Sequence, residues 1–103
     1  MVKFGLLATV VAKPGREQEA EDFLKSALPL AQAEQGTIDW FALKMDHSTF
    51  GIFDTFETEE GRQAHLSGEI AKALMAKAPD LFSEAPEINQ VDILASKCYP
   101  HLI

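Results

Sequence analysis

Three side chains that can hold or move a proton lie close together in the segment from Phe50 to Leu66. They are Asp54, Arg62 and His65. Asp54 stands in an apolar run typical of a buried strand, and the two-residue period of a strand places it on the same side as Phe50, Ile52 and Phe56. A charged carboxylate in such a layer is costly unless it is paired or used. We therefore expect any chemistry at the junction between this strand and the helix that follows it.

Each of the three residues has a catalytic and a structural interpretation. His65 can accept a substrate proton near neutral pH, or it can pack against a break in the helix. Asp54 can act as a base or substrate anchor, or it can pair with Arg62 or His65. Arg62 lies on the same side of the helix as His65, where it can hold Asp54, orient an anionic substrate or remain in solvent.

Motifs for other chemistry are missing from the sequence. Asp46 and His47 are adjacent in a turn without further ligands at a recognised spacing, so no metal site is predicted. The sequence has no CxxC pair, no glycine-rich phosphate loop and no G-x-S-x-G nucleophile turn. The single cysteine, Cys98, cannot form an internal disulfide.

The composition describes an ordinary globular chain. The 103 residues are 47% hydrophobic and 24% charged, which predicts one domain spanning residues 1–103. The net charge of −7 and nine scattered basic residues disfavour nucleic acid and anionic membrane surfaces as partners. With no long apolar run and no clear leader, we expect a cytoplasmic protein.

Periodicity and breaker residues predict four strands and two helical regions. Pro29 is expected to kink the first helical region, Gly36 to end it in a left-handed conformation, and Pro79 to stop the second region at Ala78. Thr58 is the expected N-cap of the second region, which Ser67–Gly68 interrupts. The predicted strands are 4–12, 37–45, 50–56 and 88–96, the helical regions are 16–35 and 59–78, and the tail from 97 to 103 is an expected arm or partner contact.

The order β-α-β-β-α-β predicts an α+β, ferredoxin-like fold, with an antiparallel sheet in the order 4-1-3-2 and both helical regions on one face. A hairpin centred on His47 and Ser48 would pair Phe41 with Asp54. This register places Trp40 on the opposite face, opposite Thr55, unless a bulge in its strand reverses the facing. The helix-free face is also apolar, so we expect a homodimer that packs sheet against sheet.

Three segments of the chain resemble the antibiotic biosynthesis monooxygenase (ABM) domain of the dimeric α+β barrel superfamily. VVAKPGRE at 10–17 is similar to its first strand and turn, and EQGTIDW at 34–40 to the entry of its second strand. FGIFDTFETEEGRQAHL at 50–66 is similar to its F-x-L-x-E-x-W-x-x-x-E-A-x-x-A-H segment, with Asp54 in place of Glu, Phe56 in place of Trp, and His65 matching.

The resemblance implies a homodimeric protein with a pocket between sheet and helices. Family members include cofactor-free oxygenases of phenols, anthrones or quinols. The anthrone site is not reproduced here, because Ile52, Phe56 and Arg62 replace its asparagine, tryptophan and tyrosine. The haem-degrading members carry their ligand histidine near Met75, where this chain has none, so no cofactor is expected.

The resemblance therefore implies a cofactor-independent monooxygenase acting on a small aromatic phenol or quinol. His65 would accept the proton, Asp54 would orient it or act as a second base, and Arg62 would anchor the substrate oxygen. The expected apolar walls are Phe41, Ile52, Phe56, Leu74 and Trp40. The alternatives are an isomerase of the same superfamily and a non-catalytic, dimeric small-molecule-binding or stress-related protein.

Overall fold

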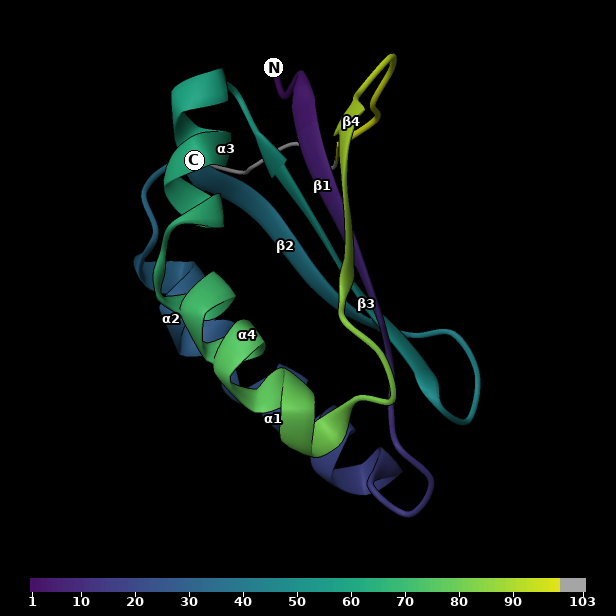
Figure 1. Ribbon diagram of the computed structural model, residues 1–103. Helices are drawn as coiled ribbons and strands as arrows, with labels where there is room; N and C mark the ends of the chain where they lie inside the picture. Colours follow the sequence, from purple (N-terminus) through teal and green to yellow (C-terminus); the bar gives the residue numbers. More distant parts are fainter. Residues whose placement is uncertain (99–103) are drawn as a thin grey trace.

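A computed structural model describes residues 1–98 of the chain, and one four-stranded antiparallel sheet forms its centre. The strands lie in the order β2-β3-β1-β4, and all helices cover one face of the sheet (Figure 1). The predicted α+β, ferredoxin-like fold and strand order are confirmed. The elements are β1 (Phe4–Val11), α1 (Glu17–Ser26), α2 (Leu28–Ala33), β2 (Thr37–Lys44), β3 (Thr49–Phe56), α3 (Glu59–Leu66), α4 (Glu69–Leu81) and β4 (Glu87–Asp92).

The core lies between the sheet and the helices. Its side chains come from the helix-facing positions of β1 and β3 and from the apolar stripes of α1 and α4, as the periods of 2 and 3.6 predict. Thr58 caps α3 as expected, because its hydroxyl accepts a hydrogen bond from the Gly61 N–H. The interruption at Ser67–Gly68 separates α3 from α4, also as expected.

The two proline positions and Gly36 differ from the predictions. The first helical region divides at Ala27, and Pro29 lies in the first turn of α2, where its missing N–H costs nothing. Pro79 does not stop α4, which continues to Leu81. Gly36 is not left-handed, since Gly15 is the only described residue with a positive φ. A Cβ at Gly36 would lie 3.0 Å from the Gly61 Cα, so this glycine permits close packing instead.

The strand ends also differ slightly. β2 ends at Lys44, β3 begins at Thr49, and β4 ends at Asp92 rather than at residue 96. The Ile93 N–H still bonds the Lys3 carbonyl beyond the end of β4. Of the predicted tail, residues 99–103 lie outside the described part of the chain.

The register of the β2–β3 hairpin differs from the prediction by one residue. Trp40 pairs with Asp54 and Phe41 with Phe53, because the turn is centred on His47 and not between His47 and Ser48. Asp46 closes the turn by accepting hydrogen bonds from the N–H groups of Ser48 and Thr49. A slip of one residue exchanges the two faces of a strand. Trp40 therefore faces the helices, which is the reversed facing that the sequence left open, although the turn register and not a bulge causes it, and Phe41 faces away from them.

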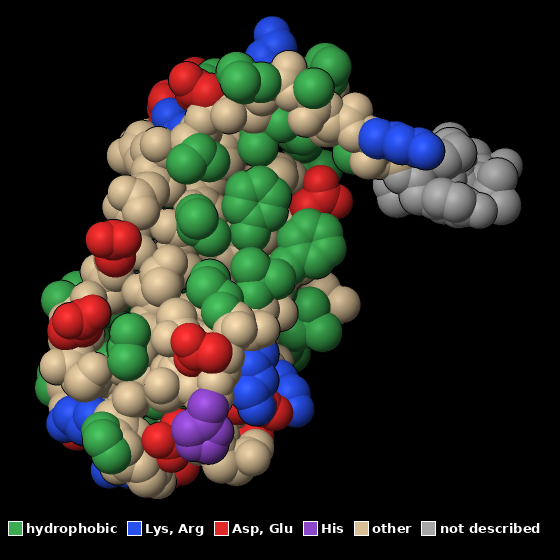
Figure 2. Space-filling model, turned by 90° about the vertical axis from the view of Figure 1, so that its right-hand side faces the viewer, with side chains coloured by type: hydrophobic (Ala, Val, Ile, Leu, Met, Phe, Trp, Pro, Cys, Tyr) green, Lys and Arg blue, Asp and Glu red, His purple; other side chains and the backbone are tan. Residues whose placement is uncertain are grey.

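The helix-free face of the sheet is apolar along its middle. Figure 2 shows hydrophobic side chains gathered there. Phe41 is 51% exposed on this face, and Leu43 and Met45 continue the apolar surface toward the hairpin. Phe53 and Leu7 are partly buried beside them.

Candidate active site

Asp54 lies on the central strand β3 and faces the helices, as the strand period predicted. Its side chain is 1% exposed, although it stands in a layer with Phe50, Ile52 and Phe56. Its cross-strand neighbours are Leu6 of β1 and Trp40 of β2. This carboxylate is therefore shut off from water by apolar residues.

His65 is the partner that compensates for the burial of Asp54. The last turn of α3 places the ring over β3, so that Nε2 lies 2.9 Å from Asp54 Oδ2 in an ion pair. On its other side, Nδ1 lies 2.6 Å from Glu34 Oε1. Thr37 Oγ1 donates to the same Glu34 oxygen at 2.7 Å. The imidazole is thus held between two carboxylates, one buried and one partly exposed.

The two carboxylates keep His65 charged. Burial by itself lowers the pKa of His65, but the close contact with Asp54, and then that with Glu34, raises it to about 9. At neutral pH both ring nitrogens therefore carry protons and face acceptors. The geometry does not favour His65 as the proton acceptor, because an imidazolium has no free lone pair. It favours a fixed cation instead.

The raised pKa predicts a stability that depends on pH. In the unfolded chain His65 titrates near its ordinary value of 6.5, and in the folded chain near 9. The stabilisation is complete below pH 6.5 and is lost as the pH rises through 9. We expect the free energy of unfolding to fall by roughly 3 kcal/mol over this window. Urea unfolding between pH 6 and 10 measures this fall in the free energy of unfolding. The dependence on pH should vanish in His65→Leu.

Arg62 is not brought to the Asp54–His65 pair. Its guanidinium is buried at the other end of α3, where it pairs with Glu59 at 2.6 Å and donates to the carbonyl oxygens of Gly5 and Val91. It also lies over the Phe4 ring. These contacts tie α3 to β1 and β4, so the expected roles of Arg62 as partner of Asp54 and as substrate anchor do not fit its position.

Glu34 is the site residue that sequence reasoning missed. It lies directly after α2, 31 residues before His65, and joins the site because the α2–β2 connection packs against α3 at Gly36 and Gly61. One signal could have drawn attention to it, since it opens the EQGTIDW segment. Nothing in the segment indicates its partner.

A small hollow lies beside Asp54 and His65, between the sheet and α4. Its volume is about 30 Å³, enough for a water molecule or a hydroxyl group. Two of the predicted walls, Ile52 and Leu74, line it. The other lining side chains are apolar and come from β1, α3, α4 and β4: Leu6, Ala8, Leu66, Ile70, Ala71 and Ile88.

The other three predicted walls lie elsewhere. Phe41 is wrong as a wall, because the register places it on the helix-free face. Phe56 is fully buried and packs against the His65 ring, with their centroids 5.5 Å apart. Trp40 faces the helices and packs against Ala27, Ala31 and Ile70, next to Asp54 rather than in the hollow.

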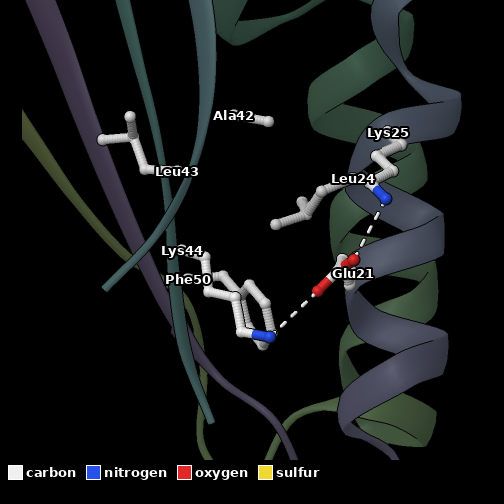
Figure 3. Close-up of a pocket in the computed structure, with 7 residues that line it drawn as sticks. All are labelled: Glu21, Leu24, Lys25, Ala42, Leu43, Lys44 and Phe50. Carbon is white, nitrogen blue, oxygen red and sulfur yellow. Dashed lines mark hydrogen bonds and ion pairs between the residues drawn. The ribbon is translucent and has the colours of Figure 1, made fainter. Parts of the chain in front are cut away.

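Two larger surface hollows flank this centre. One of about 530 Å³ lies between the α2–β2 connection and α3, and reaches Glu34 and His65. His65 therefore lines both this open groove and the small hollow beside Asp54. The other, of about 200 Å³, lies between α1 and the edge strand β2, where Glu21 bridges Lys25 and Lys44 (Figure 3). Its charged groups already satisfy one another, so it is the weaker candidate.

Residues 1–98 show neither a metal site nor a membrane-spanning helix. No group of three or more His, Cys, Asp or Glu side chains there has the arrangement of a metal site. No helix of this part of the chain is long and apolar enough to cross a membrane. His47 lies in the exposed turn, with Nε2 3.8 Å from Glu17 Oε2.

Comparison with solved structures gives a relative of high sequence identity. The NE2512 protein of unknown function from Nitrosomonas europaea is 55% identical, with a TM-score of 0.94 over 98% of both chains. This chain belongs to the NE2512 family. No protein-family model and no curated protein matches the sequence.

Beyond the NE2512 family, the likeness is one of fold. A candidate antibiotic biosynthesis monooxygenase from Nitrosomonas europaea gives a TM-score of 0.78 at 13% identity, over 89% of this chain and 90% of that one. Another from Caulobacter crescentus gives 0.75 at 18% identity, over 91% and 92%. The predicted ABM-type architecture is confirmed at this level. This chain thus shares the fold of these two proteins and carries an Asp–His–Glu cluster in which Asp54 and His65 are buried and Glu34 is partly exposed.

Proposed function

We propose that this chain is a cofactor-independent monooxygenase of small phenol- or quinol-type molecules, with Asp54 as the base. The observation that carries the proposal is the free oxygen of Asp54. Oδ1 is buried beside the apolar hollow and accepts no hydrogen bond from the described residues, while Oδ2 faces the charged His65. A buried carboxylate oxygen without a donor is costly, and a substrate hydroxyl would satisfy it.

The surroundings of Oδ1 suit proton removal followed by reaction with O₂. The substrate O–H bond breaks, an Oδ1–H bond forms, and the electron pair stays on the substrate oxygen. The His65 cation lies next to the site where negative charge develops, and the apolar walls keep water from the reactive anion. For a hydroquinone, reaction with O₂ to a hydroxyquinone and water balances atoms and takes all four electrons from the substrate.

The size of the hollow sets a condition on this proposal. About 30 Å³ accommodates the hydroxyl but not the aromatic ring. The ring must enter by separating α4 from the sheet at Ala71, Leu74 and Ile88, which line the hollow. The proposal therefore includes a displacement of α4 on binding.

The direct test is O₂ uptake with a panel of hydroquinones and phenols. We expect uptake with at least one member, with one O₂ consumed per substrate molecule and the hydroxylated product detected by mass spectrometry. Glu60→Gln is the matched control for Asp54→Asn, since it removes an exposed carboxylate from the same helix as His65. Absence of uptake with every panel member would remove the oxygenase assignment.

The second candidate is a non-catalytic small-molecule binder. It is favoured by the small size of the hollow and by the mutual satisfaction of His65 and Glu34, which a purely structural charge cluster also explains. Saturable binding of a panel member without turnover would support it. Return of the proton to a carbon atom of the substrate, without O₂ uptake, would indicate an isomerase instead.

We further propose that the chain forms a homodimer through the helix-free face of the sheet. The support is the exposed apolar surface of Phe41, Leu43 and Met45, which is costly in water. We expect sedimentation at micromolar concentration to give twice the monomer mass of 11.3 kDa. Phe41→Glu should shift the equilibrium to monomer, whereas Leu28→Glu on the helix layer should not. A monomeric wild type would contradict the proposal.

A further inference from the structure

Two buried polar groups of opposite character belong to residues paired across β2 and β3, and one of them is the candidate base. The Trp40 indole Nε1 is shielded from solvent and donates no hydrogen bond within residues 1–98. Asp54 Oδ1 is equally shielded and accepts none there. Buried polar groups in folded proteins are nearly always paired, so two unpaired neighbours call for an explanation.

The hairpin register makes these two residues direct neighbours. Trp40 and Asp54 are paired across β2 and β3, and both side chains face the helices. Side chains opposed in this way have Cβ atoms about 4.5–5.5 Å apart, a separation that one intervening group can span. The turn centred on His47 brings Trp40 to this face. A turn centred between His47 and Ser48 would place Phe41 opposite Asp54, and no donor would be present.

The chemistry of the pair selects the group that can bridge it. The bridging group must accept a hydrogen bond from an indole N–H and donate one to a carboxylate oxygen. A hydroxyl does both with a single atom. An ammonium group has no acceptor, and a carboxylate has no donor and would be repelled by Asp54. An amide accepts and donates through two different atoms, so it needs a wider separation than a hydroxyl does.

We infer that Trp40 Nε1 and Asp54 Oδ1 form a two-point subsite for a hydroxyl group on an apolar molecule. The inference rests on the proposed function only in identifying this hydroxyl as the one that loses its proton to Asp54. Trp40 then keeps its N–H on the resulting oxyanion, where a preorganised donor stabilises developing charge. Trp40 would thus select for substrates with a free hydroxyl.

The test measures binding without chemistry. Trp40 is the only tryptophan of the chain, so its fluorescence and its single indole N–H resonance report on this subsite alone. Under anaerobic conditions, hydroquinone, its monomethyl ether and its dimethyl ether are titrated by calorimetry and by ¹H–¹⁵N NMR. We expect hydroquinone to bind about 10-fold or more tightly than the dimethyl ether, because the ether leaves Asp54 Oδ1 unpaired. Hydroquinone should also shift the indole N–H resonance.

Two variants separate this inference from simple packing. Trp40→Phe keeps an aromatic ring but removes the donor, and Asp54→Asn removes the negative acceptor. Each should reduce the preference for hydroquinone over its dimethyl ether to less than about threefold. Phe41→Leu, one residue away on the opposite face, should leave the preference unchanged. If Trp40→Phe does not fold, the Asp54→Asn result and the shift of the wild-type indole resonance still decide whether the subsite exists.

The outcomes are distinct from those of the oxygenase test. Equal affinity for hydroquinone and its dimethyl ether, no binding of either, or an unmoved indole resonance would overturn the subsite. An unmoved resonance in the presence of bound hydroquinone would indicate resident water only. Selective anaerobic binding without O₂ uptake would support the subsite and remove the oxygenase, whereas uptake without selectivity would do the reverse.

Discussion

Replacing Asp54 with asparagine is expected to lower the rate of O₂ uptake by about 10²- to 10⁴-fold, the contribution typical of a positioned general base. The amide is nearly isosteric with the carboxylate, so the β3 layer stays packed, but it cannot take the substrate proton. It also removes the negative charge that His65 faces at 2.9 Å. Both effects act on the reacting hydroxyl, and neither requires a change of fold.

The measurement compares initial rates of O₂ uptake of wild type, Asp54→Asn and Glu60→Gln with the best member of the panel. Circular dichroism and the thermal midpoint show whether each variant is folded. Glu60→Gln should retain the wild-type rate. A folded Asp54→Asn that keeps more than about one third of the wild-type rate would mean that Asp54 is not the base, and would direct attention to Glu34 at the open groove.

Replacing His65 with leucine is expected to lower the free energy of unfolding by about 3–5 kcal/mol, because it leaves Asp54 as an uncompensated buried charge. The side chain of Asp54 is 1% exposed, and within the described residues no other cation lies in contact with it. Leucine fills much of the volume of the imidazole, so loss of packing contributes little. The cost therefore reports on the charge and not on a cavity.

Urea unfolding at pH 6 measures this effect, and two further variants give its cause. His47→Leu makes the same substitution at an exposed histidine and should cost less than about 0.5 kcal/mol. Asp54→Leu combined with His65→Leu removes the unpaired carboxylate and should recover much of the lost stability. A double variant no more stable than His65→Leu would show that packing, rather than charge, explains the loss.

Much of the architecture could be predicted from local patterns. Strand and helix periods place Asp54 in the apolar layer and His65 on a helix that begins at Thr58, because each depends on neighbours a few residues away. The element order and the rules of chain connection then determine the strand order, so β3 is central. A buried acid next to a helix carrying a histidine follows from the sequence alone.

The partners of these residues were decided only by tertiary structure. Arg62 and His65 lie three residues apart, yet they have different partners. Arg62 pairs with Glu59 and donates to two carbonyl groups, whereas His65 pairs with Asp54. Glu34 reaches His65 across 31 residues of sequence, since the packing of the α2–β2 connection against α3, and no local pattern, brings them together.

The facing of Trp40 depends on how the hairpin closes, since a turn centred on His47 pairs it with Asp54 and a turn centred between His47 and Ser48 would put Phe41 there. Sequence periodicity determines which residues share a side within one strand or helix. The side that a strand or helix presents to its neighbours depends on turn closure, on bulges and on the docking of elements distant in the chain. Their energies are set by contacts that exist only in the folded molecule.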